Sequence, residues 1–389
     1  TTEIYTLSLH DALPIWGTRV NVSVFRRGFK ELIPFTITRD VIPTYSVDIS
    51  FMPEPGIGYI KLSKFSATTA EELTKALSGL KSEGMESLIL DLRGNSGGYL
   101  QTAISVSDEF LGEGKLIVYT SGYNRPAQYA HATAKGIFEK GNLVVLIDEG
   151  SASSSEILAG AIQDNDRGLI IGRRSFGKGL VQEQLSLPDG SAIRLTVARY
   201  YTPTGRSIQK PYKNGHTEEY EEELYNRMIS GQLESADSIH FNDSLRYTTP
   251  GGRVVYGGGG IMPDIFIPVE KNENYRYFNE LLGKGLVYQF TFDYTDNNRP
   301  ELKKFRTFEE FDRNFSITPD LFNRLVKFAT EKGVEPDPKG IAFVRAELEN
   351  LMKALIARNL FDEKGFYPVY LRTDKTYHKA VEEIRKQQQ

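Results

Sequence analysis

The chain contains no cysteine, which excludes disulfide bridges, thiolate zinc sites and a cysteine nucleophile. It has only 5 histidines in 389 residues. No apolar run approaches the roughly 18–20 residues that a membrane-spanning helix needs, and no signal peptide is visible. A net charge of −4 and an isoelectric point near 5.9 argue against nucleic acid as a partner, because phosphate binding needs a basic surface.

What is present is the composition of a globular protein, with 40% hydrophobic and 25% charged residues and a mean hydropathy of −0.37. The length is sufficient for two or three domains with a large buried core. We expect residues 1–16 to be a non-native segment, because Thr1 to Ile15 resembles translated sequencing adapter and shows no clear period. An unusual but genuine N-terminus is the alternative. If the segment is non-native, the lack of an export signal is uninformative.

Residues 17–42 predict a β-hairpin, because Val20, Val22 and Val24 alternate with polar residues ahead of a turn and a second apolar run. The hairpin is too short to bury a core alone, so it is interpreted as the end of a larger domain. Residues 43–270 predict an α/β core, with an acidic helical insertion at about 213–250. Residues 271–389 predict a separate, mostly helical C-terminal domain.

Strand and helix patterns alternate through the α/β segment. The expected strands are 58–62, 88–92, 116–120, 143–147, 169–171 and the hairpin 181–187 with 192–197; the expected helices are 70–80, 100–110 and one that begins near Ser153.

A serine-rich turn precedes that last helix and is the first candidate for chemistry. Ser151, Ser153, Ser154 and Ser155 are all candidate nucleophiles, and the pattern does not choose among them. Serine needs a nearby base to become nucleophilic. The alternative is a helix cap, for which serine is a common residue.

Lys178, between Gly177 and Gly179, is the candidate base. A lysine acts as a base only when it is neutral, so burial would have to lower its pKa. Gln182 lies four residues further on and would orient the amine without adding charge. The alternative for a lysine flanked by glycines is an ordinary surface loop.

The segment Asn95–Gly98 links a predicted strand to a helix and offers bare backbone N–H groups as oxyanion donors. An ordinary strand-to-helix turn is the alternative. Each of these three signals is modest alone, and their order along the chain makes them specific.

Competing motifs fit less well. The segment 172–179 nearly matches a P-loop, but Gly179 replaces the Mg²⁺-binding hydroxyl and a strand pattern follows where a P-loop needs a helix. His131 is the only histidine in the α/β core and lies in a polar stretch, which disfavours a Ser-His-Asp triad. The serine turn does not match the GxSxG nucleophile elbow. No histidine–carboxylate cluster indicates a metal site.

Taken together, these residues resemble the C-terminal processing peptidases, also called tail-specific proteases, which are serine proteases with a Ser-Lys pair. The resemblance runs from about Gly17 to Val269. It rests on Tyr59-Ile60 with Phe65-Ser66, on 90–98, on Gly150 to Glu156, on 172–182, on 201–208 and on 260–264.

The resemblance implies roles for individual residues. Ser153 would be the nucleophile, Lys178 the base and Gln182 its orienting partner. The oxyanion donors would be the N–H groups of Gly98 and Gly97 and of Ser154, which replaces the usual alanine.

The resemblance also implies a crotonase/ClpP-like layered protease core, with residues 17–42 as the C-terminal remnant of a peptide-binding PDZ domain. The implied activity is cleavage of C-terminally recognised protein substrates, bound as an extended strand, through an acyl-enzyme and without metal, nucleotide or other cofactor. It implies the bacterial periplasm or cell envelope. Membrane association through a missing N-terminal segment and oligomerisation are both compatible with it. An inactive peptide-binding scaffold and a crotonase-like acyl-CoA enzyme are the alternatives.

Overall fold

The structure is a computed structural model that describes residues 16–25, 30–42, 44–212 and 217–388. Thr1 to Ile15, interpreted as non-native, lie outside the described residues. The chain divides into two compact units, Thr1–Tyr45 and Ser46–Gln389.

The first unit contains the predicted hairpin. Strands β1 (Arg19–Val24) and β2 (Ile33–Thr38) pair antiparallel, with Arg19 opposite Thr38 and Val24 opposite Ile33. The hairpin prediction is therefore confirmed.

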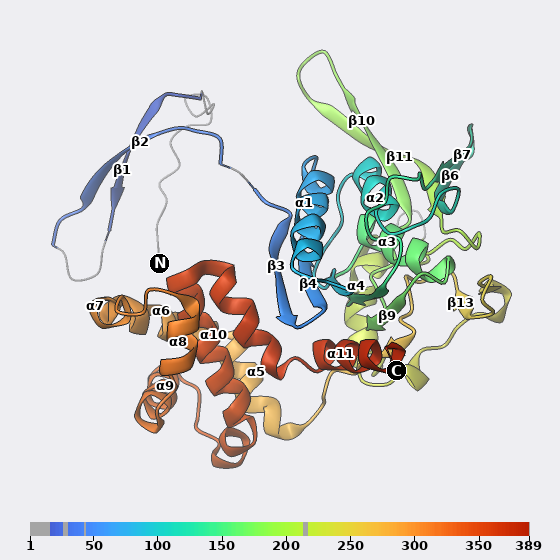
Figure 1. The fold of residues 1–389 in the computed structure, drawn as a ribbon. Coiled ribbons are helices and arrows are strands. Elements are labelled where there is room, and N and C mark those ends of the chain that lie inside the picture. The colour runs from blue at the N-terminus through green and yellow to red at the C-terminus, as the bar shows by residue number, and fades with distance from the viewer. Residues whose placement is uncertain (1–15, 26–29, 43, 213–216, 389) are drawn as a thin grey trace. The chain divides into compact units, whose positions relative to one another are not determined.

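The second unit is built on a six-stranded sheet in the order β14-β9-β8-β5-β4-β3, in which β3 is blue and β9 is green in Figure 1. Five strands run parallel and β3 is antiparallel to β4 at one edge. These strands are β3 (Val47–Glu54), β4 (Ile57–Leu62), β5 (Ser87–Asp91), β8 (Asn142–Ile147), β9 (Leu169–Gly172) and β14 (Ile265–Phe266).

A second, four-stranded antiparallel sheet has the order β10-β11-β6-β7 and carries the long hairpin that projects from the core in Figure 1. Its strands are β6 (Leu116–Gly122), β7 (Arg125–His131), β10 (Leu180–Ser186) and β11 (Ala192–Tyr201); β12 (Arg246–Thr248) and β13 (Val254–Tyr256) form a small separate ribbon. Strand β10 is an edge strand with an irregularity in its pairing between Val181 and Gln182.

The helices fall into a core group and a C-terminal group. The core helices are α1 (Thr69–Ser82), α2 (Leu100–Asp108), α3 (Ser154–Asp164) and, in the acidic insertion, α4 (Thr217–Ile229). The C-terminal helices are α5 (Arg276–Gly283), α6 (Leu286–Asn297), α7 (Arg299–Leu302), α8 (Phe308–Asn314), α9 (Pro319–Glu331), α10 (Pro338–Tyr370) and α11 (Lys375–Gln387). Helix α10 is kinked at Phe361 and Asp362, where the backbone leaves helical geometry.

The central strands are buried on both faces, which explains why they read as continuous apolar runs. Along β5, Leu88 and Leu90 face the core shared with α1, α2 and α3, whereas Ile89 faces the opposite way. Successive side chains of a strand point to opposite faces, so this alternation follows from the backbone.

Helix α11 covers that opposite face. Its Tyr377, Ala380, Val381 and Ile384 pack with Tyr59 and with other strand residues in one buried cluster. A further apolar cluster lies within α5 to α10. The C-terminal region is therefore mostly helical, as expected, but its last helix is part of the α/β core.

Candidate active site

Of the four candidate serines, Ser153 is the one whose hydroxyl is available. Its hydroxyl donates to no group among the residues that the structure describes, and Ser153 lines a pocket. The other three hydroxyls donate to backbone carbonyls and so hold the turn in place. These bonds run from Ser151 to Leu92 (2.9 Å), from Ser155 to Asn95 (2.8 Å) and from Ser154 to Gly98 (3.0 Å).

The backbone at Ser153 is strained, with φ of 54° and ψ of −113° immediately before α3. A residue other than glycine in such a region costs about 1–3 kcal/mol and is held there by its surroundings. The strained turn exposes the Ser153 side chain at the N-terminus of a helix. The residues around this turn do not match the GxSxG pattern.

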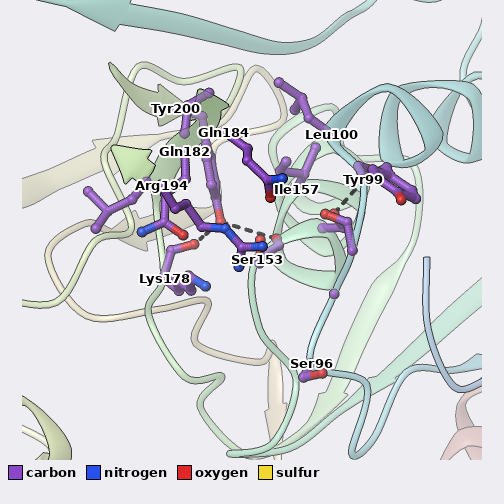
Figure 2. A pocket seen from close by; sticks show the side chains of 15 residues that line it. Ser96, Tyr99, Leu100, Ser153, Ile157, Lys178, Gln182, Gln184, Arg194 and Tyr200 are labelled. Atoms are coloured by element: carbon purple, nitrogen blue, oxygen red, sulfur yellow. Dashed lines mark hydrogen bonds between the residues drawn. The ribbon is translucent and has the colours of Figure 1, made fainter. Parts of the chain in front are cut away.

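One cavity of about 640 Å³ contains every residue predicted as part of the site. Figure 2 shows Ser153, Lys178 and Gln182 around this hollow, together with Gln184, Arg194 and Tyr200. The predicted residues that line it are Ser153, Lys178, Gln182, Gly97, Gly98 and Ser154. The structure thus brings together residues from three separate segments of the chain.

Glu156 links the serine turn to the lysine loop and was not singled out from the sequence. Its carboxylate is fully buried and accepts hydrogen bonds from the backbone N–H groups of Ser153 (2.8 Å), Gly177 (2.7 Å) and Lys178 (2.8 Å), and from the hydroxyl of Ser175 (2.5 Å). Burial raises the pKa of Glu156 above its ordinary value, and these hydrogen bonds partly offset the rise. Glu156 therefore fixes the two candidate catalytic segments against each other.

Tyr200 on β11 makes a second link between the same segments. Its hydroxyl donates to the carbonyl oxygens of Ser153 (3.1 Å) and Lys178, as the dashed lines of Figure 2 show. Burial raises the pKa of Tyr200, so the phenol stays a neutral donor. Two buried side chains, Glu156 and Tyr200, thus fix the backbones of Ser153 and Lys178 relative to each other.

The Lys178 side chain is half-buried and lines the pocket beside Ser153. Among the described residues, its amine forms no hydrogen bond or ion pair, either with Ser153 or with Gln182. Gln182 lies on the exposed edge strand β10 and contributes to the same wall. The structure places base and nucleophile candidates in one cavity without a direct bond between them.

The predicted oxyanion donors differ in availability. The N–H of Gly97 already donates to the side-chain oxygen of Asn95 at 2.9 Å. Within the described part of the chain, the N–H groups of Gly98 and Ser154 have no acceptor. Ser154 is the first residue of α3, where the helix dipole favours negative charge. Gly98 and Ser154, and not Gly97, are therefore the amides able to bind an oxyanion.

Glycine at positions 97 and 98 is required by close backbone approach. A Cβ on Gly98 would lie 1.9 Å from the Phe65 carbonyl oxygen. A Cβ on Gly97, whose φ is +97°, would lie 2.8 Å from the Cβ of Ser153 and 2.9 Å from the Ser154 nitrogen. Neither space accommodates a side chain, so the glycines let the loop pack directly on the serine turn.

The acidic insertion supports the lysine loop from outside. Arg227 of α4 is almost fully buried and donates to the carbonyl oxygens of Ser175 (2.7 Å) and Phe176 (3.0 Å). Lys210 lies with its amine 4.1 Å from the ring centroids of Phe176 and Tyr220, and burial lowers its pKa. These contacts tie the residues before Lys178 to the insertion.

Two competing interpretations fail on geometry. His131 is an exposed residue on β7 and is not part of the pocket lining. The segment after Lys178 forms strand β10 and not the helix that a P-loop needs.

Residues 56–219 match the family described as Peptidase family S41. Residues 277–362 match a second family, DUF8443, which is described as a family of unknown function.

Curated relatives cover the same half of the chain. A carboxyl-terminal-processing protease of Synechocystis sp. is 41% identical over 216 residues, which are 54% of this chain and 50% of that protein. The carboxy-terminal processing protease CtpA of Bacillus subtilis (strain 168) is 39% identical over 194 residues, which are 50% of this chain and 41% of that protein. The chain thus spans about half the length of the curated relatives that it matches.

Among solved structures, a photosystem II D1 C-terminal processing protease is 32% identical, with 52% of this chain and 56% of that chain covered and a TM-score of 0.39. Of the helices in the described part of the chain, none has the length and apolar character to cross a membrane.

Proposed function

We propose that this chain is a serine endopeptidase that cleaves protein substrates through Ser153 and Lys178. One observation supports the proposal most directly. The Ser153 hydroxyl, which donates to no described group, shares a cavity with the Lys178 amine and with two backbone N–H groups that have no described acceptor. The match of residues 56–219 to the model of peptidase family S41 supports the same reaction class.

In the proposed mechanism, a neutral Lys178 removes the Ser153 proton as the hydroxyl oxygen attacks the carbonyl carbon of the peptide bond. The N–H groups of Gly98 and Ser154 bind the oxygen that becomes negative, which is where such donors contribute most to rate. Lys178 then returns the proton to the leaving amine, and an acyl-enzyme remains on Ser153. Water activated by Lys178 releases the second product.

The mechanism requires Lys178 to move toward Ser153. The side chain has four rotatable bonds, so a change of rotamer is sufficient, and Gln182 on the same wall is placed to orient the amine.

Further parts of the proposal follow from the same resemblance. Residues 17–42 are proposed as the remnant of a PDZ domain, 43–270 as a crotonase/ClpP-like protease core, and 271–389 as a C-terminal region whose last helix completes that core. The curated relatives are named for carboxyl-terminal processing, and C-terminal recognition of substrates bound as an extended strand is proposed here also. The bacterial periplasm or cell envelope is the proposed location.

The test is cleavage of an unstructured polypeptide by the purified chain, followed by mass spectrometry of the products. Ser153→Ala and Lys178→Ala should each abolish cleavage. Ser96→Ala is the matched control, because Ser96 is an exposed serine that lines the same pocket. Cleavage that survives either catalytic substitution would reject the assigned roles, and peptide binding without any cleavage would favour the scaffold alternative.

A further inference from the structure

The charged side chains of the pocket wall are all positive. Among the residues that the structure describes, the charged side chains lining the cavity are Lys178 and Arg194, and no carboxylate lines it. Glu156 lies underneath and is fully buried, with its oxygens occupied by four donors. The wall therefore presents positive charge to whatever enters.

The register of the β10–β11 hairpin explains why Arg194 faces the cavity. Arg194 is paired with Gln184, and Gln182 lies two residues earlier on the same face of β10. All three line the cavity around Ser153 (Figure 2). The position of Arg194 is therefore set by the backbone of the hairpin.

The nearest carboxylate along the hairpin does not neutralise Arg194. Glu183 alternates with Gln182 and Gln184, so it points to the opposite face of the sheet. There it forms an ion pair with Arg125, with an N–O distance of 2.5 Å. Within the described part of the chain, the Arg194 side chain has neither an ion-pair partner nor a hydrogen bond.

Arg194 is also the permanent cation of the pocket. The proposed mechanism requires Lys178 to be neutral when it acts, whereas a guanidinium keeps its charge at every physiological pH. A guanidinium binds a carboxylate through two parallel N–H···O bonds, which gives both affinity and orientation. Tyr99, Leu100 and Ile157 line the cavity as well and offer apolar surface beside the charge.

We propose that Arg194 is a specificity-determining residue that binds a carboxylate of the substrate next to the cleaved bond. The pocket then selects acidic peptides over uncharged ones of the same shape. The carboxylate belongs either to an Asp or Glu side chain or to the free C-terminus of the substrate. This inference rests on the proposed function.

The experiment measures binding separately from cleavage, by fluorescence anisotropy with the full Ser153→Ala chain. Three labelled peptides are identical except at one position and at the C-terminus. They are a Glu peptide with an amidated C-terminus, its Gln counterpart with an amidated C-terminus, and the Gln peptide with a free C-terminus. We expect at least one carboxylate-bearing peptide to bind about tenfold more tightly than the uncharged one, as one charge-assisted pair would give. The peptide that gains affinity identifies the source of the carboxylate.

Substitutions at Arg194 then test whether the preference for carboxylate-bearing peptides depends on this residue. Arg194→Gln should remove the preference and leave affinity for the uncharged peptide unchanged, and Arg194→Lys should restore part of it. Arg199→Gln is the matched control, because Arg199 is an exposed arginine on the same strand that does not line the cavity. Equal affinity for all three peptides, or a preference that persists in Arg194→Gln, would overturn the inference. A chain that binds with this preference but cleaves nothing would overturn the proposed function alone.

Discussion

The carboxylate of Glu156 accepts a hydrogen bond from the backbone N–H of Lys178 at 2.8 Å. The same carboxylate accepts one from the N–H of Ser153, also at 2.8 Å. One buried side chain thus sets the separation between the segment that carries the proposed nucleophile and the segment that carries the proposed base. The position of the proposed base therefore depends on the fold of α3 as much as on its own loop.

Replacing Glu156 with glutamine should lower both stability and activity. Four donors converge on the carboxylate, and an amide has only one oxygen to accept them, so its NH₂ group would face N–H donors. Each buried group left without a partner costs about 1–3 kcal/mol. Urea unfolding and peptide cleavage measure the two effects. Glu149→Gln, which affects only the partly buried pair with Arg173, is the control; an unchanged urea midpoint and kcat in Glu156→Gln would refute the assigned role.

Acid should destabilise the chain through Asp91, which is buried beside Tyr59, Lys61 and Arg93. Burial alone would raise the pKa of Asp91. The charges of Arg93 and Lys61 and the hydrogen bonds to the carboxylate outweigh this effect and hold the pKa well below its ordinary value. A lowered pKa in the folded state means that the stabilisation is complete above about pH 4 and is lost as pH falls below it.

The measurement is the free energy of unfolding in urea between pH 3 and 7, for the natural chain and for Asp91→Asn. Asp91→Asn should be less stable at pH 7 and should lose less stability than the natural chain toward pH 3. Glu156 has a raised pKa and contributes the opposite slope, but it is present in both chains, so the difference isolates Asp91. Parallel pH curves for the two chains would contradict the prediction.

Helix α11 should be necessary for the stability of the α/β core. Ile384 is fully buried in the cluster that joins α11 to the central sheet. Replacing a buried isoleucine with alanine costs about 2–5 kcal/mol. Ile384→Ala should therefore lower the urea concentration at which the core unfolds. Urea titration measures this midpoint, and loss of cleavage activity serves as a second probe. Glu382→Ala, at an exposed position on the same helix, should change stability little. If α11 were independent of the core, Ile384→Ala and the natural chain would lose cleavage activity at the same urea concentration, and the prediction would be wrong.

The sequence predicted those parts of the fold whose signal is local. Strand β5 was recognised because its residues are apolar on both faces, and the hairpin β10–β11 because a Pro-Asp-Gly turn separates its strands. Strand β7 was missed because Arg125–His131 is polar and mostly exposed. The packing of α11 on the sheet was missed because a helical period shows which face is apolar but not what covers it.

The candidate site divides in the same way. The serine-rich turn and Lys178 were singled out because turn and glycine signals mark them, whereas the choice of Ser153 among the four serines came from the family resemblance. Glu156, Tyr200 and Arg194 were not found, because their significance depends on distant partners. For Glu156, the available signal was an acidic residue three positions after a serine at the start of a helix. An ordinary capping box has the same pattern, so this signal did not indicate a special role.

Arg227 should control the rate of cleavage although it lies outside the cavity. It donates to the carbonyl oxygens of Ser175 and Phe176, which precede Lys178, and it forms an ion pair with Glu223 at 2.5 Å. Arg227→Gln removes the positive charge and the guanidinium group that binds both carbonyl oxygens, so the loop that carries Lys178 becomes more mobile. Since displacement of a catalytic group by about 1 Å can cost up to 100-fold in rate, we expect kcat to fall about 10- to 100-fold.

The control is Arg246→Gln, at an exposed arginine of β12. Affinity of the Ser153→Ala chain for peptide should stay close to normal when Arg227→Gln is added, because Arg227 does not line the cavity. A fall in kcat with unchanged binding thus separates displacement of Lys178, the proposed base, from damage to the pocket. If Arg227→Gln kept the natural kcat, the insertion would have no part in positioning Lys178, and its contacts would serve stability alone.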